Sequence, residues 1–183
     1  MSREKTFHIG DTVVYPMHGI GRVKSIVKQI IEEQSQYFYQ IVIEGQIGGE
    51  VLVPVTEANT LGLRFVLEAP EVKEVFKRLQ IIPEKSLRPR QHTLNYAWCK
   101  ERLRQGNALG LAEVRRFLHD LEQIESLREF KFRQLRNYVS TQLTAEIALA
   151  LNCPENDAHG LVEEALTSKQ PVQIPLVITH HEW

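Results

Sequence analysis

GDTVVYPMHGIGRV, residues 10–23, predicts a strand, a turn and a second strand within one short stretch. The β-branched and aromatic side chains of residues 12–15 suit a pleated, half-buried surface. Pro16 has no N–H to donate to a ladder, so it ends this first strand or lies on an edge. Gly19 and Gly21 allow a positive φ or a close backbone approach where the apolar pattern restarts. We therefore expect the N-terminal third to be built on a hairpin.

The next thirty residues continue the strand pattern. Polar and apolar residues roughly alternate in Arg22–Ile31, and Tyr37–Ile43 is strongly β-forming. We expect a polar turn over residues 32–36 between these strands, and a short strand over residues 51–54 that ends at a proline. Several short antiparallel strands in so few residues predict a small, Tudor/SH3-like β-barrel or a strongly curved sheet. Such a sheet has an exposed edge unless another segment pairs with it.

The rest of the chain predicts helices, so the fold class is α+β with two domains. The domains expected are a Tudor-like domain over 1–64, a helical domain over 65–166 and a tail over 167–183. The helices expected from apolar periodicity and from glycine and proline stops cover about 70–79, 92–105, 111–124, 126–151 and 155–166. The apolar face expected on the longest helix contains Leu127, Phe130, Leu135, Tyr138, Val139, Leu143 and Ile147.

Composition is that of an ordinary globular protein, with 43% hydrophobic and 25% charged residues among 183. No apolar run approaches a membrane span of roughly 18 residues, and the N-terminus has no signal core, so a cytoplasmic location is expected. Two distant cysteines argue against a disulfide scaffold and a zinc site. Residues 71–150 carry 15 Lys and Arg against 10 Asp and Glu. That excess fits either a nucleic-acid surface or a solvated helical face.

The sequence contains none of the common catalytic or nucleotide-binding motifs, and we expect no enzyme, no cofactor and no metal site. His18 has no accompanying nucleophile, which favours a turn residue over a catalytic base. His180 and His181, beside Glu182, favour a polar tail over a metal site. Cys99 lies inside a predicted helix, where it is expected to pack.

The opening stretch resembles the signature of the CarD/CdnL family of bacterial transcription factors. The pattern F-x-x-G-D-x-V-V-Y-P-x-H-G runs here from Phe7 to Gly19, and V-P-V follows at residues 53–55. A later L-x-x-G at residues 103–106 precedes A-E-V-R at residues 112–115. The resemblance covers about residues 7–166. The same N-terminal module occurs in transcription-repair coupling factors, whose helicase motifs this sequence lacks.

The resemblance implies a non-catalytic regulator that acts on promoter open complexes. Its N-terminal domain would dock on the lobe/protrusion region of the RNA polymerase β subunit by laying an edge strand against a strand of β. The polymerase-binding residues that this implies are Gln29, Val51, Leu52, Val53 and Pro54. The helical domain would meet promoter DNA at the upstream edge of the bubble, where an aromatic wedge enters the minor groove. No membrane is implied, and the protein is expected to be a monomer.

The sequence departs from the family pattern at both surfaces. Leu52 stands where members often have Arg, and His92 falls on the position of the Trp wedge. Trp98 is either a core aromatic or a displaced wedge. The DNA-binding residues expected are Arg88, Arg90, His92, Asn95 and Tyr96. The alternative hypothesis is a divergent paralogue that serves as a protein–protein interaction module with little or no DNA binding.

Overall fold

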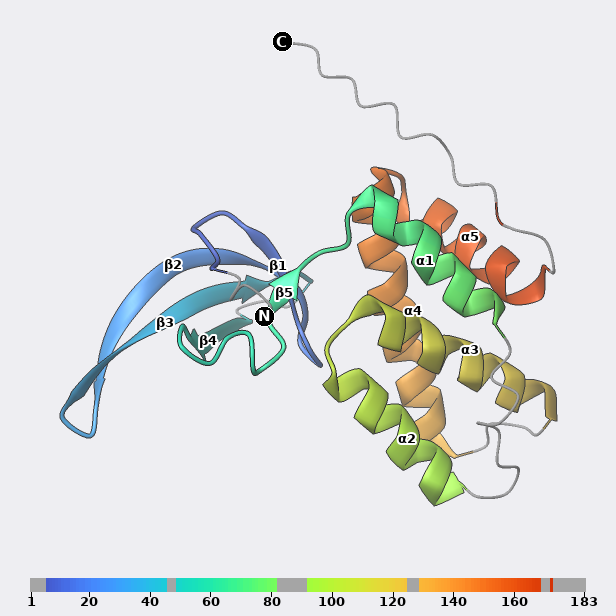
Figure 1. Cartoon of the computed structure of the whole chain (residues 1–183), viewed down its shortest axis with the longest axis horizontal. Helices are drawn as coiled ribbons and strands as arrows, with labels where there is room; N and C mark the ends of the chain where they lie inside the picture. The colour runs from blue at the N-terminus through green and yellow to red at the C-terminus, as the bar shows by residue number, and fades with distance from the viewer. Residues whose placement is uncertain (1–5, 46–48, 82–91, 125–128, 169–171, 173–183) are drawn as a thin grey trace, which may run out of the picture. The chain divides into compact units, whose positions relative to one another are not determined.

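The computed structural model describes residues 6–45, 49–81, 92–124, 129–168 and 172, and it divides into two compact units. Unit 1 contains Met1–Val66 together with Arg104–Asn107. Unit 2 contains Leu67–Leu103 and Ala108–Trp183. Unit 1 is built on a sheet and unit 2 on helices, so the fold is α+β, as the sequence predicts (Figure 1).

Unit 1 contains one antiparallel sheet of five strands, which pair in the order β4-β3-β2-β1-β5. The strands are β1 (Thr12–Tyr15), β2 (Gly19–Ile31), β3 (Gln34–Ile43), β4 (Glu50–Pro54) and β5 (Arg64–Phe65). β2 and β3 form a long, bent hairpin that dominates the sheet (Figure 1). The pairing order does not close into a barrel, because β4 and β5 are its two ends. The fold is therefore a curved, open relative of the predicted Tudor-like module.

The turn between β2 and β3 is shorter than the sequence predicts. Only Glu32 and Glu33 separate the strands, and both have positive φ, at 49° and 66°. Two consecutive residues of this kind form the turn whose twist matches that of a hairpin. The usual sequence signal for this turn is Asn-Gly. Because Glu32 and Glu33 do not match that signal, the sequence predicts a longer polar turn over residues 32–36. β5 is also absent from the sequence prediction, and its two residues pair with β1.

The core of unit 1 lies against one face of the sheet. Phe7 is 1% exposed, and its ring meets the ring of Tyr39 edge-on at 5.6 Å between centroids. The Phe7 N–H also donates to the Tyr39 hydroxyl at 3.3 Å. The other buried residues of this core are Val13, Val23, Ile41, Ile43, Val53, Ala58 and Leu63. A tail residue before the first strand therefore anchors the sheet.

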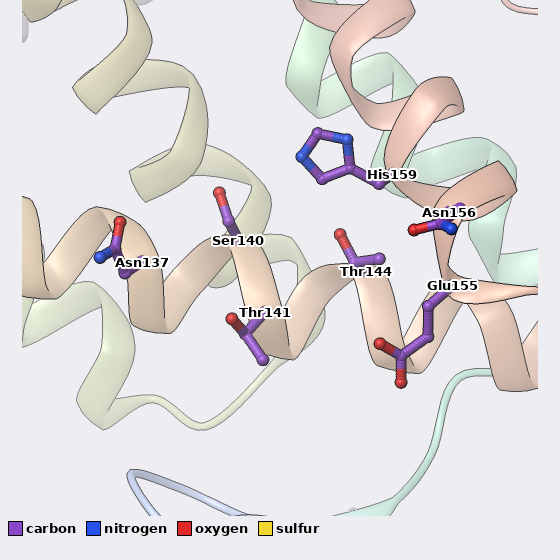
Figure 2. A pocket seen from close by; sticks show the side chains of 7 residues that line it. All are labelled: Asn137, Ser140, Thr141, Thr144, Glu155, Asn156 and His159. Atoms are coloured by element: carbon purple, nitrogen blue, oxygen red, sulfur yellow. The ribbon is translucent and has the colours of Figure 1, made fainter.

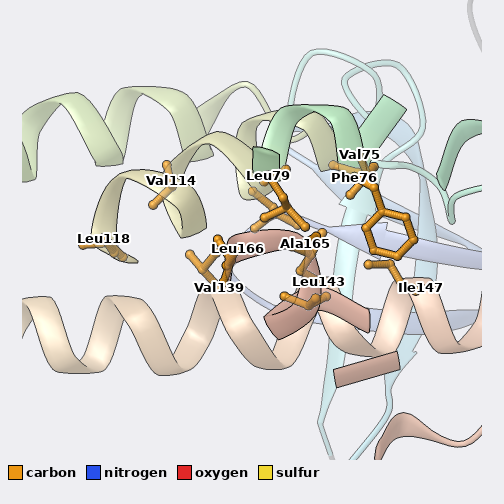
Figure 3. Packing of buried hydrophobic residues seen from close by; sticks show 14 of the residues in the cluster. Val75, Phe76, Leu79, Val114, Leu118, Val139, Leu143, Ile147, Ala165 and Leu166 are labelled. Carbon is orange, nitrogen blue, oxygen red and sulfur yellow. The ribbon is translucent and has the colours of Figure 1, made fainter. Parts of the chain in front are cut away.

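Unit 2 contains α1 (Ala69–Gln80), α2 (His92–Arg104), α3 (Ala108–Ile124), α4 (Phe130–Leu151) and α5 (Glu155–Thr167). Apolar side chains from α1, α3, α4 and α5 meet in its core (Figure 3). Helical spacing in the sequence predicts that four apolar residues of α1 share one face, and all four are buried: Val72, Val75, Phe76 and Leu79. Across the described ranges, no helix is long and apolar enough to cross a membrane.

The apolar face predicted for the longest helix, α4, is wrong near the start of that helix. Phe130, expected in the core, is 64% exposed, whereas Phe132 is 1% exposed. The helix begins at residue 130, and residues 125–128, including Leu127, lie outside the described part of the chain. Counting in steps of three and four from Phe132 reaches Leu135, Val139 and Leu143, all buried. Phe130 lies off that stripe and faces solvent.

Candidate functional site

β4 is an end strand of the sheet, and the direction of its backbone groups follows from its ladder with β3. One hydrogen bond joins the Ile43 N–H to the Gly49 carbonyl at 2.8 Å, and another joins the Val55 N–H to the Tyr37 carbonyl at 3.0 Å. Residues of an antiparallel strand alternate between bonding their partner and pointing away from it. The odd-numbered residues of β4 therefore direct their main chain toward β3, and the even-numbered residues direct theirs toward the open edge.

Leu52 is the centre of this open edge. Its N–H and carbonyl both point outward by the alternation, and its side chain is 44% exposed. Pro54 has no N–H, and its carbonyl accepts a hydrogen bond from the Glu57 N–H at 3.1 Å. Val53 is fully buried, so it anchors the strand in the core. No described strand pairs with this side of β4.

A polar network fixes the start of β4. Glu50 accepts hydrogen bonds from Lys24 and Gln40, both at 2.7 Å, and Ser25 donates to Gln40 at 2.6 Å. A bulge between Val23 and Ser25 places this part of β2 opposite Gln40. The hydrogen bond from Lys24, helped by that from Gln40, lowers the pKa of the exposed Glu50 carboxyl. Sequence reasoning missed this network, because its members come from three strands.

Gln29 does not join the β4 edge. It is exposed on β2 and pairs with Gln36, and β3 lies between β2 and β4 in the sheet. The structure thus brings together four of the five polymerase-binding residues expected from the sequence, Val51, Leu52, Val53 and Pro54. It leaves Gln29 on another strand.

The expected DNA-binding residues lie at and before the start of α2. Arg88 and Arg90 fall outside the described residues, and His92 is the first residue of α2. Asn95 is 1% exposed, so its side chain does not reach the surface in this structure. Tyr96 is half-buried, and its ring meets that of Phe132 edge-on at 5.7 Å.

Positive charge lies beside Tyr96. The Lys131 ammonium is 5.4 Å from the centroid of the Tyr96 ring, a cation–π arrangement, and it also pairs with Glu129 at 2.7 Å. Trp98 packs against Phe117 at 4.8 Å between centroids. Trp98 is partly buried and packs against the core of unit 2, which favours the core aromatic over the displaced wedge.

The structure describes two side chains that the sequence analysis weighed for reactivity, His18 and Cys99, and both pack against neighbouring residues. His18 stacks on Tyr15, with ring planes 6° apart and centroids 4.7 Å apart, as a turn residue would. Burial raises the pKa of the Cys99 thiol to about 12, which keeps it protonated. Within the described ranges, no three histidine, cysteine or acidic residues are grouped to hold a metal. His180, His181 and Glu182 lie outside those ranges.

Comparison with known proteins finds similarity that covers both the sheet and the helical part of the chain. Residues 7–67 match the CarD-like/TRCF RID domain, a span that includes all five strands of unit 1. A protein of Bacillus subtilis (strain 168), named "Putative transcription factor YdeB", is 29% identical over 133 residues. That alignment covers 72% of this chain and 84% of the other protein. It is too long to be confined to the sheet, so it extends into the helical part.

Proposed function

We propose that this chain, a member of the CarD-like family through residues 7–67, is a transcription factor that binds RNA polymerase through unit 1. The matched domain is an RNA polymerase-interacting domain. The Bacillus relative carries the name of a transcription factor, and its similarity spans most of both proteins. The family is one of transcription regulators, which accords with a role that involves no catalysis.

The observation that supports a specific docking mode is the open edge of β4. An extended segment of a partner can add a strand to such an edge, so that main-chain hydrogen bonds supply affinity. Glu50 and Leu52 direct their main chains to this edge, and the Lys24–Glu50 ion pair holds the start of the strand. We propose the lobe/protrusion region of the polymerase β subunit as the partner strand.

The helical unit is proposed to lie near upstream promoter DNA in the open complex. The basic excess of residues 71–150 supports this assignment, since cations neutralise phosphates. The proposed contact is the start of α2, with Arg88, Arg90 and His92 and with Tyr96 beside the Lys131 ammonium. Asn95, which is buried, is left out of the proposed surface.

Binding of the isolated β lobe to the full chain tests the docking mode. A Leu52→Asp variant is expected to weaken binding at least about tenfold, because a carboxylate at the paired edge must be desolvated. The matched control is Ile9→Asp, which adds the same charge at a site that is 65% exposed and precedes β1. If the wild type and Leu52→Asp bind with equal affinity, the docking surface lies elsewhere in unit 1.

A second function has one observation in its favour. Asn95 is buried and Tyr96 is packed against Phe132, so neither is presented as a free wedge for DNA. A protein–protein module with little DNA binding would fit these two residues. Open-complex lifetime on a promoter separates the two functions: His92→Ala shortens it if the helical unit supports DNA, and leaves it unchanged if the chain acts through protein contacts alone.

A further inference from the structure

The helical unit contains a polar pocket of about 280 Å³ between α4 and the first turns of α5 (Figure 2). Its lining, which includes Ser140, Thr141 and Glu155, consists of hydroxyls, amides, one histidine and one carboxylate. This mixture favours no particular ligand. The sheet of unit 1 has a feature with a more definite chemistry, a second open edge.

β2 is much longer than β1, the strand beside it. β1 pairs only with Gly19–Arg22, and the Val23 carbonyl accepts a hydrogen bond from the Gly10 N–H at 2.8 Å. Beyond Val23, no described segment pairs with this side of β2, although the strand continues to Ile31. Figure 1 shows the far half of the β2–β3 hairpin extending past the other strands. The sheet therefore has an open edge on β2 besides the one on β4.

The main chain of Lys28 points to this second edge. Lys28 lies opposite Tyr37 on β3, and the Tyr37 carbonyl accepts a hydrogen bond from the Val55 N–H, on the β4 side. The two residues of such a non-hydrogen-bonded pair direct their main chains away from each other, so Lys28 turns its N–H and carbonyl away from β3. Ile26 and Ile30 do the same by alternation. The edge thus offers backbone donors and acceptors to an added strand.

The side chains along this edge form an exposed apolar surface with one charge. Because directly opposite residues share a face, Tyr37 lies beside Lys28, between the two isoleucines. Ile26 is 44% exposed, Ile30 75% and Tyr37 54%. The Lys28 side chain is exposed and has no partner among the described residues. A two-stranded ribbon is only marginally stable in water, so a third strand would both cover and stabilise this part of the hairpin.

Lys28 determines which kind of strand fits. Two copies of the chain paired antiparallel about Lys28 would place two ammonium groups opposite each other, which is destabilising. A strand with a carboxylate opposite Lys28 would instead form an opposite-charge pair, and apolar residues two positions away would pack beside Ile26 and Ile30. Glu32 and Glu33, at the turn, disfavour a strand that is acidic along its whole length. One acidic residue between two apolar ones is therefore the complementary pattern.

We propose that the open edge of β2 binds an extended segment of a partner protein with the pattern apolar-x-acidic-x-apolar, the acidic residue lying opposite Lys28. Main-chain hydrogen bonds with Ile26, Lys28 and Ile30 supply affinity, and alternate side chains supply specificity. β2 and β4 lie on opposite sides of β3. This partner segment and a polymerase strand on β4 would therefore occupy different edges of the sheet.

NMR titration of the ¹⁵N-labelled full chain with the peptide acetyl-Thr-Val-Thr-Glu-Thr-Val-Thr-amide tests this proposal. Saturable shifts of the amide signals of Ile26, Lys28 and Ile30 are expected, with a Kd of roughly 0.1–10 mM. The first control peptide carries N-methyl glutamate, which removes the central main-chain donor. The second exchanges the glutamate with the following threonine, which moves the carboxylate to the other face. The third has lysine in place of glutamate. Each control peptide should bind at least about fivefold more weakly.

Charge reversal at the edge gives the sharper test. Lys28→Glu should reverse the preference, so that the lysine peptide binds more tightly than the glutamate peptide. Lys73→Glu, at an exposed lysine of α1, makes the same charge change elsewhere and should leave the preference as in the wild type. The Lys28→Glu protein should bind the isolated β lobe with wild-type affinity, which separates this edge from the edge of β4.

Four results would overturn the proposal. Equal affinity for the glutamate and lysine peptides would show that charge is not recognised. If none of the peptides gave saturable shifts, the edge would not accept a strand of this chemistry. Shifts of the Ile26, Lys28 and Ile30 signals on dilution of the free protein would assign the edge to a second copy of the chain. Loss of β-lobe binding in Lys28→Glu would make the edge part of the polymerase interface.

Discussion

Arg116 and Asp120 form a two-pronged ion pair inside unit 2, with both side chains 9% exposed. The Arg116 Nε donates to one carboxylate oxygen of Asp120 at 2.9 Å, and Nη2 lies 2.7 Å from the other. The remaining Nη1 donates to the carbonyls of Leu79 at 3.2 Å and Leu166 at 2.9 Å. One guanidinium on α3 thus holds the ends of α1 and α5.

Removal of the Asp120 charge should destabilise unit 2 strongly. Asp120→Asn leaves the Arg116 guanidinium buried without a counter-charge, which costs about 3–5 kcal/mol. Urea unfolding measures this loss of unfolding free energy. The control is Glu74→Gln, which breaks the exposed Lys77–Glu74 pair and should cost less than about 1 kcal/mol. Similar losses for both variants would mean that the buried pair contributes no more than a surface pair.

Proline substitution on β4 should separate docking from folding. Leu52→Pro removes an N–H that points to the open edge, so the ladder to β3 is kept. Val53→Pro removes an N–H directed toward β3 and should destabilise unit 1. We expect Leu52→Pro to keep the wild-type circular dichroism spectrum while it binds the isolated β lobe at least about tenfold more weakly. A folded Leu52→Pro protein with full affinity would exclude strand addition at β4.

The unsatisfied hydroxyl of Thr144 predicts a gain in stability on its removal. Thr144→Val keeps the shape and removes a buried polar group without a partner, so the free energy of unfolding should rise by about 1 kcal/mol. Thr141→Val makes the same chemical change at an exposed pocket position and should stay within about 0.5 kcal/mol. Thermal unfolding of the two variants makes the comparison. A less stable Thr144→Val protein would show that the hydroxyl has a partner in the folded chain.

The Glu50 network predicts a pH dependence of unit 1. Hydrogen bonds from Lys24 and Gln40 lower the pKa of Glu50 in the folded state. The stabilisation is therefore complete above the ordinary glutamate pKa and is lost as the pH falls through the lowered value. Side-chain NMR titration of Glu50 checks the direction. In a Lys24→Met variant its midpoint should move back toward the ordinary glutamate value, and an unchanged midpoint would assign the shift to another group.

The parts of the fold that could be predicted are those set by local sequence. The helix α1 and its buried face follow from spacing within twelve residues, and all four predicted members are buried. The Glu32–Glu33 turn could not be predicted, because the surrounding hairpin imposes positive φ on residues without that preference. β5 has only two residues, and it becomes a strand through pairing with β1.

The candidate site likewise has features that local sequence predicts and features that depend on the tertiary structure. The strand that contains Leu52 could be predicted from its composition, whereas the outward direction of its main chain depends on its register with β3. The exclusion of Gln29 from that strand is a matter of strand order, which the sequence does not encode locally.

The open edge of β4 also limits how this protein can recognise itself. If two copies paired antiparallel about Leu52, Glu50 of each copy would lie opposite Pro54 of the other. Pro54 offers no N–H, so each such pair would lose a hydrogen bond that a foreign strand in another register can make. A five-residue strand that begins with a carboxylate and ends with a proline is a poor template for fibrillar stacking. The same features that leave the edge available to a partner thus disfavour the symmetric pairing of two copies about Leu52.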